Sequence, residues 1–146
     1  MVNIKTMVTI NVTREILAPL DKVWNIISDV DNDPRYWLGT KSIKNISKNE
    51  NIIEREVVIA FKQSKCKETV IIDPKKSVRI NITDGPIRGT KTIIINPAGI
   101  NKTKVDVIWD IRLSGLMGMF TTIIKKHIRQ GTEESLERIA RVVVIG

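Results

Sequence analysis

The sequence predicts an α+β protein in which one long C-terminal helix covers an antiparallel sheet. Isoleucine and valine number 26 and 14 against 6 leucines among the 146 residues, and β-branched side chains favour strands. Residues 41–113 form short apolar stretches whose polar, Gly- and Pro-containing connections are too short for parallel crossovers. Residues 119–144 contain no proline and repeat apolar or small residues at intervals of three and four, which is typical of a helix.

The N-terminal elements follow from alternation and proline placement. Residues 8–13 alternate apolar and polar side chains, as a half-buried strand does. Pro19 then opens a helix predicted over residues 20–30, where apolar residues recur at helical spacing. Pro34 opens a short second helix before the chain turns.

Six strands are predicted between this helix pair and the long helix. They are Ser42–Ser47, Ile52–Phe61, Cys66–Ile72, Val78–Thr83, Thr90–Ile95 and Lys104–Leu113. An antiparallel sheet with one buried face needs a cover, and the long helix is the only element large enough to provide it. The length predicts one domain over residues 1–146.

The long helix has one apolar face that contains two small residues, Gly131 and Ser135. The face consists of Phe120, Ile124, Ile128, Gly131, Ser135, Ile139 and Val142. Small residues here predict either a helix that stands away from the sheet and leaves a cavity, or close backbone packing at Gly131.

Several classes of protein and site are disfavoured by the sequence. No run approaches the roughly 18 apolar residues of a transmembrane helix, and the first residues lack an apolar signal segment, so we expect a cytoplasmic protein. One cysteine, Cys66, and one histidine, His127, exclude an intrachain disulfide and a Cys- or His-rich metal site. The sequence lacks a Ser-His-Asp set, a Walker loop and a G-x-G-x-x-G motif, and we expect no metal and no cofactor.

Asp29, Asp31 and Asp33 have the spacing that opens an EF-hand loop. The obligatory glycine would fall at Pro34 and the bidentate glutamate at Thr40, so the motif fails. These aspartates are therefore interpreted as helix caps.

Positive charge is concentrated in the middle of the chain. Residues 62–104 carry 10 basic and 3 acidic groups, within a net charge of +8 for the chain. Such a surface attracts RNA, a ribosome or an anionic membrane. The favoured interpretation is that these lysines and arginines keep exposed strands soluble and block edge pairing.

Three motifs resemble the START-like superfamily, also called SRPBCC or helix-grip proteins. Residues 16–24, Ile-Leu-Ala-Pro-Leu-Asp-Lys-Val-Trp, followed by Ile27-Ser28-Asp29, resemble its opening. Tyr36-Trp37 is similar to its aromatic pair after the first helix, and residues 134–139 to its C-terminal helix motif. The resemblance is greatest to the polyketide cyclase/dehydrase and lipid-transport group. It implies a curved seven-stranded antiparallel sheet that grips the long helix, with a hydrophobic cavity between them.

The resemblance implies binding or transport of a hydrophobic small molecule: a lipid, an isoprenoid, a quinone or a polyketide-like compound. The alternatives are a polyketide-cyclase-like cyclase or dehydratase, and a regulatory module that binds RNA, a ribosome or an anionic membrane through residues 62–104. No oligomeric state is predicted. The residues expected to line the cavity are Trp37, Val57, Ile59, Phe61, Ile80, Ile93, Val107, Trp109, Phe120, Ile124, His127, Ile128, Gly131 and Ser135.

Arg55 and His127 are the candidate catalytic groups. Arg55 alternates in register with apolar residues of its strand, so it either points inward, where it could bind a ligand oxygen, or lies in a frayed strand end and snorkels outward. The outward arrangement is favoured. His127 lies at the margin of the apolar helix face. There it either holds a ligand carbonyl or acts as a general base or, as we expect, is a partly buried structural residue.

Overall fold

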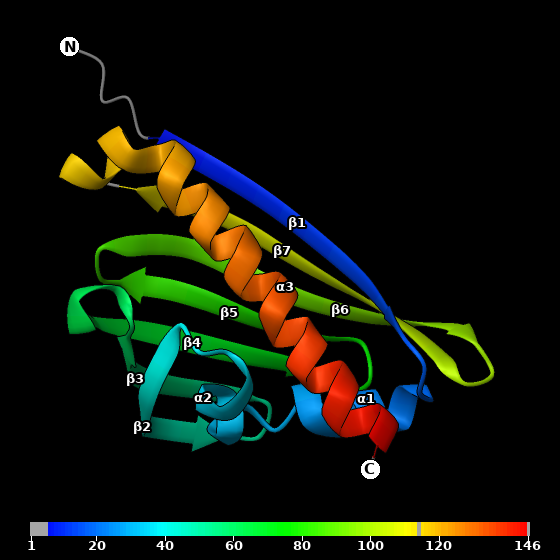
Figure 1. The fold of residues 1–146 in the computed structure, drawn as a ribbon. Coiled ribbons are helices and arrows are strands. Elements are labelled where there is room, and N and C mark those ends of the chain that lie inside the picture. The colour runs from blue at the N-terminus through cyan, green and yellow to red at the C-terminus, as the bar shows by residue number, and fades with distance from the viewer. Residues whose placement is uncertain (1–5, 114, 146) are drawn as a thin grey trace.

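The computed structural model describes residues 6–113 and 115–145. Within these residues the chain forms seven strands, three α-helices and short 3₁₀ turns (Figure 1). In chain order these are β1 (Thr6–Ile16), α1 (Leu20–Ile27), the turn Val30–Asn32, α2 (Asp33–Tyr36), β2 (Thr40–Asn49), β3 (Ile52–Ile59), the turn Phe61–Gln63, β4 (Lys65–Asp73), β5 (Ser77–Asp84), β6 (Ile87–Gly99), β7 (Lys102–Leu113), the turn Gly115–Phe120 and α3 (Thr121–Ile145).

All seven strands belong to one antiparallel sheet. Its order is β1-β7-β6-β5-β4-β3-β2, so the first two strands of the chain form its opposite edges. Apart from β1 and β7, the strands that are neighbours in the sheet also follow each other in the chain and are joined by short connections. The sheet curves around α3, which lies diagonally across its concave face, while α1 and α2 cover one end (Figure 1). This is the START-like helix-grip fold that the sequence resemblance implied.

The core is closed by the C-terminal half of α3. Leu136 and Ile139 are fully buried there, against α1 and the inner faces of the strands. In the N-terminal half, Ile124 and Ile128 are only half-buried, although both pack against the core. The helix is therefore tightly packed at one end and loosely packed at the other.

The structure changes some element boundaries. The helix predicted over residues 20–30 ends at Ile27, where the Ser28 hydroxyl donates to the carbonyl of Trp24 at 2.7 Å. Val142 is 46% exposed, and Ala140 and Val143 take its place in the core. The apolar face of α3 thus turns gradually around the helix, because 3.6 residues per turn do not match a strict alternation of four and three.

Asp29 occupies the N-cap position of the turn Val30–Asn32, but none of the three aspartates forms a capping hydrogen bond, so the prediction that they cap helices through their side chains is wrong. Neither the turn at Val30–Asn32 nor α2 has a side-chain cap hydrogen bond. Asp29 accepts from Asn32, and Asp31 accepts from Asn45 and Lys48. Asp33 is buried, and its partner is described below.

Candidate ligand-binding cavity

A cavity of about 760 Å³ lies between α3, α2 and the inner face of the sheet. Its apolar wall includes Trp37, Ile59, Ile80, Ile82, Ile87, Trp109, Ile124 and Ile128. Protein interiors are packed about as densely as organic crystals, so a space of this size is not a packing defect. It falls within the roughly 300–1,000 Å³ of small-molecule sites.

Gly131 marks the place where α3 stands away from the sheet. A Cβ atom built on this glycine meets no heavy atom within 4 Å, and Gly131 lines the cavity. Close backbone packing at Gly131, one of the two arrangements predicted, is therefore excluded. The missing side chain leaves open space.

The cavity has an apolar mouth. Leu38, Phe61, Phe120 and Ile123 all line it and are all exposed, from 37% for Phe61 to 61% for Ile123. They come from the loop after α2, the β3–β4 connection, the turn Gly115–Phe120 and the first turn of α3. His127 also lines the cavity and is exposed, so it is not the partly buried residue we expected.

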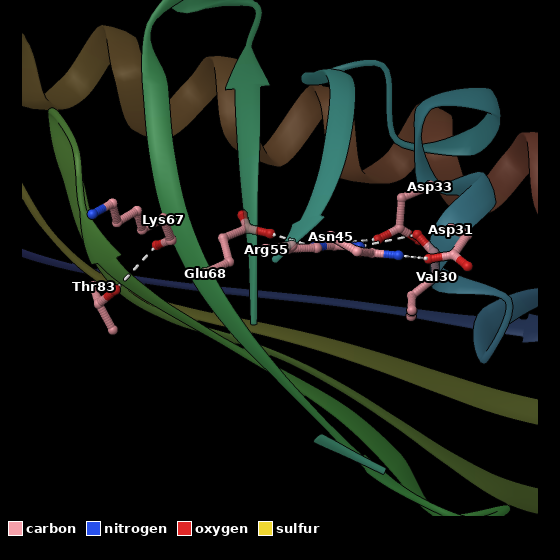
Figure 2. Close-up of polar contacts among 8 residues, drawn as sticks. All are labelled: Val30, Asp31, Asp33, Asn45, Arg55, Lys67, Glu68 and Thr83. Carbon is pink, nitrogen blue, oxygen red and sulfur yellow. Dashed lines mark hydrogen bonds and ion pairs between the residues drawn. The ribbon is translucent and has the colours of Figure 1, made fainter. Parts of the chain in front are cut away.

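Arg55 points inward from β3 and lies in a network of buried ion pairs (Figure 2). The side chain is 1% exposed, and the predicted outward arrangement is wrong. Nε donates to Glu68 at 3.0 Å, Nη2 to Asp33 at 2.8 Å and Nη1 to the carbonyl of Val30 at 3.0 Å. These bonds tie β3, β4 and α2 together. Burial of the charged guanidinium is tolerated because hydrogen bonds to two carboxylates and a carbonyl replace those that it would form with water.

Asp33 shows the cost of this burial. Desolvation raises the pKa of its carboxyl above the usual value, against the opposing attraction of the Arg55 and Lys91 charges. Burial favours the neutral acid, while the guanidinium favours the carboxylate.

Lys91 extends this charged group to the cavity wall. It lies on the inner face of β6, is 6% exposed and lines the cavity. Its Nζ atom lies 3.2 Å from the ring centroid of Trp37 and 5.0 Å from that of Trp109. Burial lowers the pKa of Lys91 from 10.5 to about 7, although Asp33 and Glu68 act in the opposite direction. The amine thus changes charge near neutral pH.

Hydrogen bonds to α3 fix the Trp109 ring beside Lys91. Its Nε1 donates to the Thr132 hydroxyl at 3.0 Å, and that hydroxyl donates to the carbonyl of Ile128 at 2.7 Å. At the other side, Arg138 donates to the carbonyl of Tyr36 at 2.9 Å, which links α3 to α2. The aromatic wall is therefore held by the helix as well as by the sheet.

Most residues predicted to line the cavity do so. These are Trp37, Ile59, Phe61, Ile80, Trp109, Phe120, Ile124, His127, Ile128, Gly131 and Ser135. Arg55, which was predicted to point outward, lines the cavity as well. Val57, Ile93 and Val107 do not line it. They are at most 2% exposed, and Ile93 and Val107 are paired neighbours in the packed core. Their alternation identified the inner face correctly, but it does not distinguish core from cavity wall.

The sequence analysis missed Asp33, Glu68, Lys91 and Thr132. A signal existed for two of them, because Glu68 alternates with Cys66 and Val70, and Lys91 alternates with Ile93 and Ile95. Charged residues on the inner faces of three strands were a pattern that single-strand alternation could have revealed. Asp33 carried no such signal, because its position depends on the path of the loop before α2.

The comparisons with known proteins identify the family. The structure of the Zhui aromatase/cyclase from Streptomyces sp. R1128 matches with a TM-score of 0.81 at 13% identity, over 94% of each chain. A START superfamily protein from Mycobacterium smegmatis matches with a TM-score of 0.74 at 15% identity, over 92% of this chain and 98% of that one. Norcoclaurine synthase from Thalictrum flavum, in complex with dopamine and hydroxybenzaldehyde, matches with a TM-score of 0.71 at 16% identity, over 96% of this chain and 88% of that one.

At these identities the structures show a shared fold. The family model for polyketide cyclases/dehydrases and lipid transport matches residues 7–144, and the chain belongs to that family. No curated protein sequence matches it significantly.

Two further findings concern only the described part of the chain. None of its helices is long and apolar enough to cross a membrane. No group of three or more His, Cys, Asp or Glu side chains among residues 6–113 and 115–145 is arranged to hold a metal ion.

Proposed function

We propose that this protein binds and carries a hydrophobic small molecule in the cavity between the sheet and α3. The observation that carries the proposal is the apolar cavity of about 760 Å³. The family, which includes lipid transport, and the fold are consistent with it. A lipid, an isoprenoid, a quinone or a polyketide-like compound has a large apolar surface. Binding in this cavity would remove that surface from water, which is favourable.

The geometry of α3 supports the proposal further. Its N-terminal half stands away from the sheet at Gly131, while its C-terminal half is fully packed. In an empty apolar cavity, the side chains of the wall lack dispersion contacts on the side that faces the cavity. A ligand would restore those contacts, and the exposed apolar mouth provides its entrance.

The cyclase or dehydratase alternative is supported less well by its original candidates. Arg55 already donates hydrogen bonds to two carboxylates and a carbonyl through its Nε, Nη1 and Nη2 atoms, and these bonds hold the guanidinium in a structural network. His127 is exposed at the mouth, where a reacting group would not be shielded from water. A binding function needs neither group, so we place it first.

Native mass spectrometry of gently purified protein tests the proposal, followed by organic extraction of the bound molecule. We expect a mainly apolar compound at substoichiometric to full occupancy. Gly131→Phe protein is the matched control, because its ring would fill the cavity, and it should retain less of the same compound. Repeated recovery of empty wild-type protein, with no thermal shift from lipids or quinones, would overturn the proposal.

A further inference from the structure

Lys91 is a buried charged residue in the wall of a largely apolar cavity. Its neighbours along the inner face of β6, Ile93 and Ile95, are apolar core residues. The lysine instead places an amine 3.2 Å from the ring centroid of Trp37 in a largely apolar space. A buried lysine costs stability unless its charge has a partner.

The carboxylates near Lys91 are already engaged by Arg55. Asp33 and Glu68 each accept from that guanidinium at 2.8 and 3.0 Å. Within the described residues, Lys91 itself forms no ion pair and no side-chain hydrogen bond. Its positive charge meets the faces of two indole rings, and its N–H donors remain available toward the cavity.

We propose that Lys91 anchors the anionic oxygen of an amphipathic ligand, whose head is a carboxylate or an enolate and whose apolar body extends to the mouth of the cavity. The inference rests on the proposed binding function and specifies the ligand class. An anionic oxygen accepts the N–H donors of Lys91 and completes the ion pair that Asp33 and Glu68 leave open. The exposed apolar rim at Leu38, Phe61 and Ile123 then contacts the far end of the ligand.

The charges around the site favour an anion over a cation. Arg55 and Lys91 are both positive, and the two carboxylates share the guanidinium between them. A ligand cation would lie beside the Lys91 ammonium, and the two like charges would repel each other. The other titratable groups that line the cavity are Lys62, Cys66, His127, Glu134 and Arg138. Lys62 and His127 are exposed, so water screens their effect.

Three probes with one tail and different heads test the inference on the whole protein: decanoate, decan-1-ol and decylammonium. Calorimetric titration near neutral pH should show decanoate binding at least about tenfold more tightly than decan-1-ol, because hydrogen bonds to charged groups contribute that much. Decylammonium should bind most weakly. Equal affinities for acid and alcohol, or a preference for decylammonium, would overturn the inference and leave the proposed function standing.

Substitution localises the effect to Lys91. In Lys91→Met protein, decanoate should lose about tenfold in affinity while decan-1-ol stays within about twofold. Lys67→Met is the matched control, because Lys67 is an exposed lysine that does not line the cavity. It should change neither affinity by more than about twofold.

The remaining outcomes are also decisive. An equal loss of decanoate affinity in both variants would overturn the role of Lys91. If Lys91→Met protein does not fold, the head-group series on wild-type protein still decides the ligand class. Failure of all three probes to bind would contradict the proposed function itself, and the inference would fall with it.

Discussion

At the scale of single residues, the inner face of this sheet combines apolar side chains with a small set of buried charges. Arg55, Glu68 and Lys91 come from three different strands and occupy positions that alternation would assign to the core. Asp33 completes the set from α2. Two positive and two negative groups share one buried region, so their mutual attraction offsets part of the cost of burying each charge.

Arg55 can be tested as the centre of this group. Arg55→Met leaves Asp33 and Glu68 buried without the guanidinium and should destabilise the protein by about 3–5 kcal/mol. Arg79→Met on the exposed face of β5 is the control and should change stability by about 0.5 kcal/mol or less. Urea denaturation of both variants measures the difference. Equal effects would show that the ion pairs contribute nothing specific.

Lys91 makes stability depend on pH. Its pKa is about 7 in the folded protein and 10.5 as the ordinary value, so between these values the unfolded chain binds more protons. Stability should therefore rise as the pH increases from 7, by at most about 1.4 kcal/mol per pH unit. The rise should be absent in Lys91→Met protein, as measured by urea midpoints between pH 7 and 9. The same slope in both proteins would contradict the lowered pKa.

Cys66 does not obscure this comparison. Burial raises the pKa of its thiol from 9.0 to about 11, so its contribution to stability falls as the pH rises above 9. Lys91 is not among the causes of that shift, and both proteins retain Cys66. Keeping the measurements at or below pH 9 separates the two groups.

Residue-level chemistry was only partly predictable from the sequence. The strand containing Arg55 identified the correct inner face, because alternation has a period of two. The direction of Arg55 was predicted wrongly, because its partners Glu68 and Asp33 are 13 and 22 residues away. Long-range pairing depends on strand order and loop path, which one strand's pattern does not contain.

At the scale of elements, α3 determines whether the interior is a core or a cavity. Its C-terminal half fills the space with Leu136 and Ile139, and its N-terminal half carries Gly131. The sequence predicted the helix and its small residues but left open whether Gly131 faced space or backbone. Whether Gly131 faces open space or backbone depends on the distance between α3 and the sheet. That distance is set by the size of the side chains that pack between them at other positions.

Gly131→Phe tests the stand-off directly. The ring should enter the cavity, lower the affinity for decanoate at least about tenfold, and leave stability unchanged or raised, since glycine inside a helix costs about 0.5–1 kcal/mol relative to alanine. Gln130→Phe, one residue away on the exposed face and outside the cavity wall, should leave affinity within about twofold. Calorimetry and denaturant unfolding without ligand measure both quantities. Destabilisation of Gly131→Phe by roughly 1–3 kcal/mol would indicate overpacking and remove Gly131 from the site.

At the scale of the whole molecule, the basic residues of the 62–104 segment lie outside the cavity wall, apart from Lys62 and Lys91. The basic residues of the 62–104 segment are exposed or half-buried except Lys91, which turns inward. On β4, Cys66 and Glu68 line the cavity, so Lys65 and Lys67 lie on the opposite face by alternation. In Figure 2 the side chains of the consecutive residues Lys67 and Glu68 lie on opposite sides of the strand. Overall topology and the position of this charge were both predictable, because they follow from short connections and local composition.

Charge reversal separates the two faces. Lys65→Glu with Lys67→Glu should leave decanoate affinity within about twofold, because the sheet lies between these groups and the cavity and exposed charges are screened within about 8 Å at physiological salt. The same variant should weaken association with RNA or with anionic vesicles and reduce its dependence on salt, if the basic surface binds such partners. Lys41→Glu with Lys44→Glu on β2 changes the net charge equally outside the 62–104 segment. Equal weakening by both pairs would attribute the association to net charge alone, whereas loss of decanoate binding in a folded Lys65/Lys67 variant would place the basic surface within the ligand site.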